Sequence, residues 1–162
     1  MTGKTHMAVG VGAAMMLIPT NDVQTLTIGA TFAVLGSLVP DLDTESSEVS
    51  RKLKDGLMGA VVIAVLLSAA YYKFNLDIRS YLGRFLPESP AVYGIAIAIL
   101  MGAVVVSKFT PHRTFTHSIL GVITFGWPVY LMISSYASWF IIGYAAHILA
   151  DVITTNGVAM FY

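Results

Sequence analysis

Histidine and aspartate side chains lie beside, or inside, long apolar segments of this chain. They occur in four separated stretches: THMAVG with His6, PDLD with Asp41 and Asp43, HRTFTHS with His112 and His117, and HILAD with His147 and Asp151. Imidazole nitrogens and carboxylate oxygens are ligands for zinc and other divalent transition metals. The chain has no cysteine, so any bound metal must be held by nitrogen and oxygen.

The HILAD stretch is the most informative of the four. His147 and Asp151 are four residues apart, so on a helix both side chains project from one face. This spacing occurs in two-ligand zinc sites, and also in hydrogen-bonded pairs on helix surfaces. The surrounding segment, SWFIIGYAAHILADVITT, is apolar on all sides, and ionisable residues in such segments are costly and usually functional. This context favours the functional interpretation.

PDLD and THMAVG carry less information when each is taken alone. An acidic pair after a proline at a helix end is more typical of a turn or a cap. Two carboxylates separated by one residue can also bind one metal each or bridge two, as Asp41 and Asp43 would. His6 by itself is typical of an ordinary terminal histidine, and its interest depends on its predicted neighbours.

HRTFTHS contains two histidines that cannot share a helical face. His112 and His117 are five residues apart, roughly 140° around an ideal helix. A loop before a helix that starts near Thr114 or Thr116 would still direct both inward. The alternative is a basic juxtamembrane loop in contact with lipid head groups. In either case Arg113 suits a phosphate contact or a metal-bound carboxylate.

The composition indicates a membrane protein. Hydrophobic residues make up 56% and charged residues 11%, against about 25% charge in an average soluble domain. Nine basic and nine acidic residues cancel, so no overall field attracts nucleic acid. Charge-free runs approach the ~20 residues that cross a bilayer as a helix. They are residues 23–40, 56–72, 90–107 and 118–146, the last long enough for two crossings with a turn near residues 134–136, and a shorter apolar run covers 7–18.

We therefore expect an all-α helical bundle, a single domain over residues 1–162, with about five to six membrane-embedded helices. Residues 19–22 should form a turn, with Asp22 as the N-cap of a helix that ends at Pro40. The polar residues 41–56 should form a loop or a short amphipathic helix in water. Residues 73–90 should include a helix lying at the bilayer surface.

If all six runs cross the membrane, the loops alternate sides. One side then carries Lys4, Arg51, Lys52, Lys54, Lys108 and Arg113, and the other carries Lys73, Arg79 and Arg84. The positive-inside rule places the N-terminus and HRTFTHS in the cytoplasm. The same alternation brings all four histidine and aspartate stretches to one membrane face, although it was derived without them.

Four motifs together resemble a known family. TGKTH, GSLVPDLD, HRTFTHS and HILADVITTNGV, in this order over nearly the whole chain, resemble the YdjM-like family of predicted membrane-bound metal-dependent hydrolases. The resemblance implies a metal site formed by His6, Asp41, Asp43, His112, His117, His147 and Asp151. The family is in turn grouped with the zinc-dependent phospholipase C and single-strand nuclease superfamily, whose members are all-helical and bind a zinc cluster through His and Asp.

The chain departs from this family pattern in two places. The family usually has glycine where this chain has Thr114, which changes the flexibility of the loop. Relatives also tend to continue beyond the position of Tyr162, so this member is expected to be short at its C-terminal end.

These observations predict a hydrolase of the inner, cytoplasmic membrane that cleaves a phosphoester of a lipid or lipid-linked substrate. One or more zinc ions would activate water and polarise a phosphoryl oxygen. Asp41 or Asp43 would bridge metals or accept the proton of the water, and Arg113 would hold the phosphate with Thr114 and Thr116. Two alternatives are a metal or proton transporter and a non-catalytic membrane protein with a structural metal.

Overall fold

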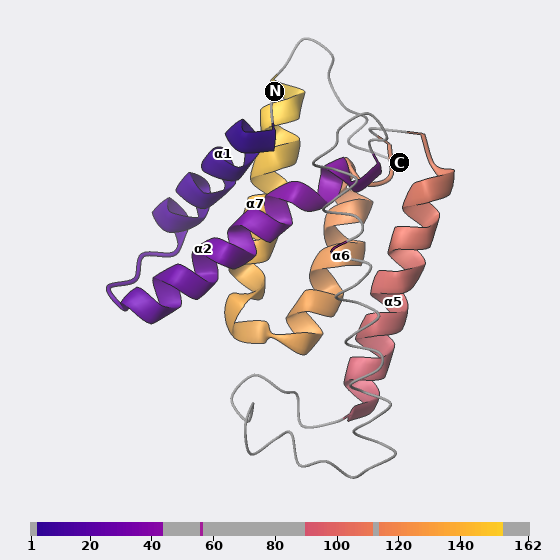
Figure 1. Ribbon diagram of the computed structural model, residues 1–162, viewed down its shortest axis with the longest axis horizontal. Coiled ribbons are helices and arrows are strands. Elements are labelled where there is room, and N and C mark those ends of the chain that lie inside the picture. The colour runs from indigo at the N-terminus through magenta and orange to yellow at the C-terminus, as the bar shows by residue number, and fades with distance from the viewer. Residues whose placement is uncertain (1–2, 44–55, 57–89, 112–113, 154–162) are drawn as a thin grey trace.

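A computed structural model describes residues 3–43, 56, 90–111 and 114–153, and these ranges are helical with short connections (Figure 1). The helices are α1 (Gly3–Leu17), α2 (Val23–Leu38), η1 (Val39–Asp43, a 3₁₀ helix), α5 (Pro90–Phe109), α6 (Ile119–Met132) and α7 (Ser134–Val152). The described ranges contain no strand, so the all-α prediction is confirmed. The predictions for the loop after Asp43, for the apolar run 56–72 and for the surface helix in 73–90 fall almost entirely outside the described residues.

The helix boundaries follow local signals in the sequence. Asp22 is the N-cap of α2, as predicted, and its side chain accepts a hydrogen bond from the Thr25 amide at 2.8 Å. The long apolar run after Ser118 divides at Ile133 into α6 and α7, close to the predicted turn. α2 ends at Leu38, and the chain continues through Pro40 as the 3₁₀ helix η1. Pro40 lacks the N–H group that an α-helix would need there, so the winding changes before it.

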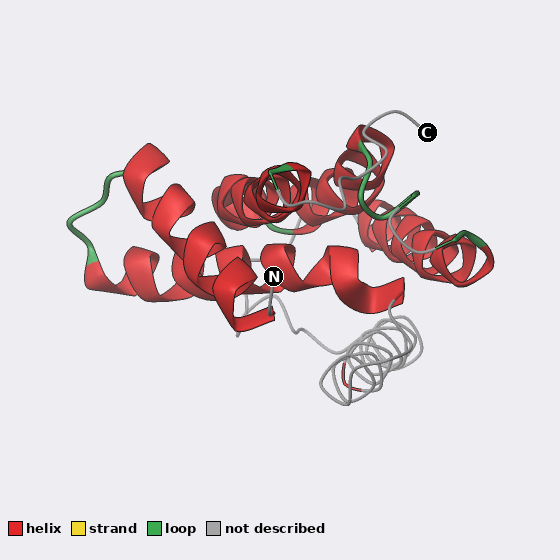
Figure 2. Cartoon of the chain, turned by 90° about the horizontal axis from the view of Figure 1, so that it is seen from above, coloured by secondary structure: helices red, strands yellow, loops and turns green. Residues whose placement is uncertain are grey.

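α7 is the central helix of the described bundle. It packs against α1, α2 and α6, whereas α5 packs mainly on α6 (Figure 2 shows this arrangement from above). One cluster of buried side chains joins α7 to α6 and the segment before it, through Phe115, Phe125, Phe140 and Tyr144. A second cluster joins α7 to α1 and α2 around Trp139. The helices that carry the candidate site are thus all held against α7.

Glycines allow α1, α2 and α7 to approach closely at one level of the bundle. A Cβ atom on Gly36 would overlap the carbonyl oxygen of Phe140, and one on Gly143 would overlap the carbonyl oxygen of Ala33. A Cβ atom on Gly10 would lie 2.9 Å from the Cβ of Ser37. Small residues at such interfaces let helix backbones come together. We call Gly10, Gly36, Ser37 and Gly143 the glycine junction.

Two described helices are long and apolar enough to cross a membrane. They cover Val23–Asp41 and Ala91–Phe109, with mean hydropathies of 1.5 and 2.1. α1 and α6 are shorter, with 15 and 14 residues. α7 is a continuous helix, but its apolar run is interrupted by the polar side chains of the candidate site. α5 and α6 expose large apolar side chains such as Phe109, Ile123 and Trp127, which suits contact with lipid. Two spanning helices are thus supported in the described part, and the count of five to six stays a prediction.

Candidate metal centre

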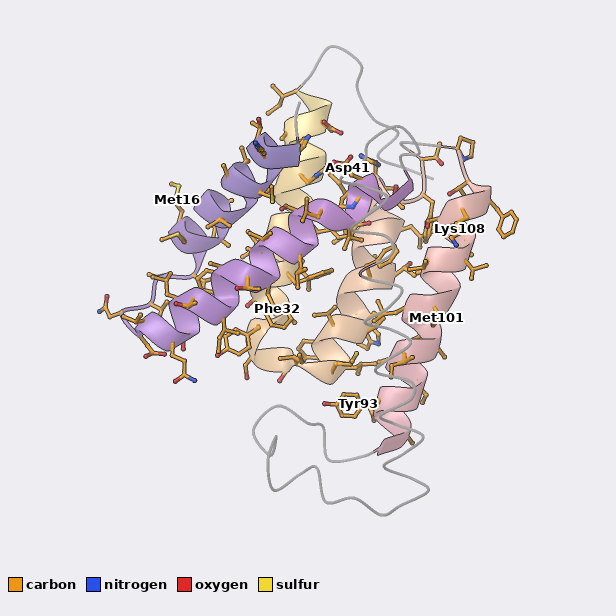
Figure 3. All side chains as sticks on the ribbon, in the orientation of Figure 1. Met16, Phe32, Asp41, Tyr93, Met101 and Lys108 are labelled. Atoms are coloured by element: carbon orange, nitrogen blue, oxygen red, sulfur yellow. The ribbon has the colours of Figure 1, made fainter. Side chains whose placement is uncertain are left out.

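The ends of the described helices bring the candidate residues to one end of the bundle. His6 lies near the start of α1, Asp41 in η1 after α2, His117 just before α6, and His147 and Asp151 near the end of α7; Figure 3 labels Asp41 at this end. The glycine junction lies one helical turn away. His6, Asp41 and His147 are each four residues from Gly10, Ser37 and Gly143, respectively. The junction therefore sets the spacing of the helix ends that carry the site.

The group is buried except at Asp41. His6 and Asp151 are 2% exposed and His117 and His147 are 0% exposed, whereas the side chain of Asp41 is 30% exposed. Burying an ionised carboxylate such as that of Asp151 is costly unless cations or donors surround it. Three imidazole rings face it here. The site is therefore a closed polar cluster with its open side at Asp41.

The nitrogen and oxygen atoms of this cluster are separated by 3.4–3.9 Å, close to the spacing of ligands around a metal ion. Nε2 of His6 lies 3.4 Å from Oδ1 of Asp151. Oδ2 of Asp151 lies 3.4 Å from Nε2 of His117 and 3.7 Å from Nε2 of His147. Oδ1 of Asp41 lies 3.9 Å from Nε2 of His117 and 3.7 Å from Nε2 of His147. These separations exceed the 2.7–3.2 Å that is usual for N–H···O hydrogen bonds. With bonds of ~2.0–2.2 Å, ligand atoms around a tetrahedral zinc ion are roughly 3.3–3.6 Å apart. The two 3.4 Å contacts of Asp151 fall in this range, and the other three lie slightly above it.

Two overlapping groups of three side chains therefore satisfy the distance requirement for holding a metal ion. They are His6, His147 and Asp151, and Asp41, His117 and His147. Both groups offer only nitrogen and oxygen, as the absence of cysteine requires. The residues present fit a divalent metal ion.

His147 is fixed in the tautomer that a metal ligand needs. Its Nδ1 lies 2.6 Å from the backbone carbonyl oxygen of Ser37. A carbonyl oxygen can only accept, so Nδ1 carries the proton and donates it. Nε2 of a neutral ring then presents its lone pair toward Asp41 and Asp151. The Ser37 carbonyl is available because it lies in the last turn of α2, where carbonyls lack helical partners. Such a hydrogen bond to the outer nitrogen is typical of metal-binding histidines.

His117 is positioned by the segment that leads into α6. Ser118 is the N-cap of α6 and accepts from the Gly121 amide at 3.2 Å, so α6 starts at Ile119, later than the predicted start near Thr114 or Thr116. Thr116 Oγ1 lies 3.1 Å from Nδ1 of His117. The Tyr144 hydroxyl on α7 donates to the Thr116 carbonyl at 2.7 Å. Residues 115–118 are buried, which supports the inward orientation of His117 over a loop in contact with lipid head groups.

Five of the seven predicted ligands meet in this cluster. His112 and Arg113 lie outside the described residues, and so does the side chain of Asp43, whose backbone ends η1. Sequence reasoning missed the Ser37 carbonyl and Tyr144. A backbone acceptor leaves no signal in the sequence. Tyr144 stands three residues before His147 on the same helix face, so its hydroxyl could have been considered as a support for the site.

The fold and the site together define a helical membrane protein with a buried group of His and Asp side chains able to hold a metal ion. A sequence model of the family described as "YdjM inner membrane protein" matches residues 1–162, so the chain belongs to this family. This confirms the resemblance carried by the four motifs and supports a membrane location. Searches of curated proteins and of solved structures find no match.

Proposed function

We propose that this protein is a membrane-embedded, metal-dependent hydrolase that cleaves a phosphoester, most simply that of a lipid or lipid-linked substrate. The observation that carries the proposal is the arrangement of the cluster. Four donors are buried, two overlapping groups of three side chains are spaced closely enough to hold a metal ion, and Asp41 lies at the open side. A structural metal site is usually closed by its ligands, whereas a catalytic site keeps an open position.

Zinc is the metal that this donor set favours. Imidazole rings with carboxylates suit zinc and its neighbours among the transition metals, whereas calcium and magnesium prefer oxygen ligands. A zinc ion at the cluster would polarise a phosphoryl oxygen and bring the pKa of a bound water to about 7.

The chain's own residues divide the remaining tasks. His117, His147 and Asp151 are buried donors and would hold the ion. Asp41 is within reach of water from outside and would accept the proton of the attacking water, a role worth about 10²–10⁴-fold in rate. Arg113 follows Pro111 and His112 in the segment that leads to His117, and would hold the phosphate bidentately.

The distribution of buried polar groups favours a site over a transport path. Among the described residues, the buried polar and charged side chains are His6, Ser37, Ser107, Thr116, His117, Ser118, His147 and Asp151. All of them lie in the helix ends or connections at the site end of the bundle. The opposite half of the described core is filled by apolar and aromatic side chains such as Trp139 and Ala14. A permeation path would need polar groups at several depths.

The test uses the full chain, purified in detergent and loaded with zinc. Wild type, His147→Ala and Asp41→Asn are each assayed against vesicles of phospholipids and of lipid phosphates, with release of the head group or phosphate as the readout. We expect turnover by wild type only, and bound zinc in wild type and Asp41→Asn but not in His147→Ala.

Two results would contradict the hydrolase. Zinc uptake into proteoliposomes without hydrolysis would instead support a transporter. Bound zinc whose removal unfolds the protein, again with no hydrolysis of any substrate, would support a structural metal.

A further inference from the structure

The three histidines of the cluster do not have equivalent positions around Asp151. His117 and His147 both face Oδ2 of its carboxylate, at 3.4 and 3.7 Å, whereas His6 faces Oδ1 at 3.4 Å. The rings of His117 and His147 are 5.3 Å apart at an interplanar angle of 65°. The rings of His6 and His147 are stacked, 3.8 Å apart at 22°.

Ring geometry decides which histidines can share an ion. The lone pair of an imidazole nitrogen lies in the plane of the ring, so an ion bound by two rings must lie in both planes. Two nearly parallel, stacked rings have no such point nearby, and this excludes a common ion for His6 and His147. The distance between their nitrogen atoms alone would have allowed one.

The pair formed by His117 and His147 meets both requirements. Their planes intersect at a steep angle. An ion ~2.0–2.1 Å from a ring nitrogen is roughly 3.2 Å from the ring centre, so two rings in tetrahedral positions have centres about 5.2 Å apart. The observed 5.3 Å agrees with that value. Asp151 Oδ2 faces both nitrogens and completes a set of three ligands, with Asp41 on the remaining side.

We propose that the cluster binds a single ion through His117, His147 and Asp151, and that His6 is a positioning residue rather than a ligand. His6 covers the face of the His147 ring and directs Nε2 toward Oδ1 of Asp151, the carboxylate oxygen turned away from the ion. At 3.4 Å this contact is longer than a usual hydrogen bond. An N–H group there attracts Oδ1 electrostatically and so favours the carboxylate orientation in which Oδ2 stays aligned with the two ligand histidines. Partners of this kind are worth about 10–100-fold in metal affinity. The inference rests on the metal site of the proposed function and is independent of hydrolysis.

A glutamine at position 6 separates a positioning role from a ligand role. Its amide NH₂ group can donate to Oδ1 of Asp151 in place of the imidazole N–H, but an amide is a poor substitute for a zinc-binding imidazole. His6→Ala removes both possibilities. Lys4→Gln, at an exposed position two residues earlier on α1, is the matched control for a substitution to glutamine on this helix.

The experiment titrates cobalt(II) into the chelator-treated full-length protein in detergent and records its visible absorption, with zinc competition to give the affinity. We expect one cobalt per chain in wild type, Lys4→Gln, His6→Gln and His6→Ala, with the same band positions. His6→Ala should bind zinc about 10–100-fold more weakly, and His6→Gln should recover most of that loss. His117→Ala and His147→Ala should show no saturable binding.

Three outcomes would overturn the inference. They are two ions per wild-type chain falling to one in His6→Gln, an altered cobalt spectrum in His6→Gln, and loss of binding in His6→Gln as complete as in His147→Ala. Absence of metal binding in wild type would instead overturn the proposed function itself.

Discussion

At the residue scale, Tyr144 connects the two halves of the candidate site. It is fully buried on α7, and its hydroxyl donates to the carbonyl of Thr116, directly before His117. We predict that Tyr144→Phe lowers the free energy of unfolding by about 1–2 kcal/mol, because the Thr116 carbonyl loses a buried donor. It should also weaken zinc binding, because the segment carrying His117 loses its anchor. Chemical unfolding and zinc competition measure the two effects.

Tyr130→Phe is the control, because Tyr130 is exposed on α6. Equal zinc affinity in wild type, Tyr144→Phe and Tyr130→Phe would contradict the role of Tyr144 as the anchor of the His117 segment.

Asp22 gives a second prediction at this scale. Its carboxylate accepts hydrogen bonds from the hydroxyl and the amide of Thr25, and these hold the pKa of Asp22 below its usual range. A lowered folded-state pKa means that the ionised cap stabilises the start of α2 above the unfolded value, about 3.9, and that this stabilisation is lost as the pH falls through the folded pKa.

An NMR titration of the Asp22 carboxyl carbon tests this pKa shift. We expect a midpoint below the ordinary aspartate value, and a return toward that value in Thr25→Ala. A midpoint at or above the ordinary value in the wild-type protein would contradict the capping geometry.

The types and spacing of the site residues could be predicted from the sequence. Which of them would bind the ion and which would only position a ligand could not be predicted. The i, i+4 pair His147 and Asp151 is visible in an apolar helix, and the order of the motifs brings His6, Asp41 and His117 to it. The stacking of His6 on His147 depends on how closely α1 approaches α7. That distance is set by packing at the glycine junction, which no motif encodes.

At the scale of the helices, the glycine junction positions the site. Because a Cβ atom on Gly36 or Gly143 would overlap a backbone carbonyl of the facing helix, we predict that Gly36→Ala and Gly143→Ala force α2 and α7 apart. The expected loss is about 1–3 kcal/mol of unfolding free energy, together with weaker zinc binding, since the Ser37 carbonyl would move away from His147. Thermal unfolding in detergent and zinc competition report the two effects.

Other helical glycines provide the control for these substitutions. Nothing lies within 4 Å of a Cβ atom built on Gly12 of α1 or on Gly102 of α5. Gly12→Ala and Gly102→Ala should leave the unfolding temperature unchanged or slightly raised, because alanine lowers the entropy of the unfolded chain. If the Gly36 and Gly143 variants behaved like these two, close packing would not be what places the site.

The helix boundaries could be predicted where a cap or a break is local, and less well where packing decides. Asp22 and the break at Ile133 follow from the sequence. The sequence predicts the start of α6 several residues too early, because Thr114 and Thr116 are as plausible as N-caps as Ser118. Burial of Phe115 and the hydrogen bond from Tyr144 hold residues 115–117 outside the helix. That choice depends on tertiary contacts.

At the scale of the whole molecule, the site end of the bundle is predicted to face the cytoplasm by the distribution of lysine and arginine. The chain has no cysteine, so single introduced cysteines report orientation without background. Pro111→Cys lies at the site end, and Asn21→Cys and Ser135→Cys lie at the opposite end, all at exposed positions.

A membrane-impermeant maleimide applied to intact spheroplasts should label Asn21→Cys and Ser135→Cys, and should label Pro111→Cys only after lysis. The reverse pattern would place the site on the outer face. Labelling of all three in intact spheroplasts would contradict opposite ends of the bundle lying on opposite sides of the membrane.

That the protein belongs to the membrane proteins could be predicted from its composition, since 56% hydrophobic and 11% charged residues are typical of a chain with membrane-spanning helices. The number of crossings stays a prediction. α7 is long enough to span a membrane, but the polar residues His147 and Asp151 lie within it. α1 is short because it ends at Leu17, before the turn at Pro19. The polar residues that form the site thus lower the mean hydropathy of the helix that carries them, which makes a membrane crossing harder to recognise from the sequence.

Elemental analysis of the purified protein tests the central claim, which is that the cluster of His and Asp side chains is a metal centre. The full chain and its His147→Ala variant are produced with zinc in the medium, purified without chelator and measured by mass spectrometry of the metals against protein concentration. We expect close to one zinc per wild-type chain and essentially none in His147→Ala, with both proteins folded. A wild-type protein free of metal, or a His147→Ala variant that keeps its full metal content, would contradict it.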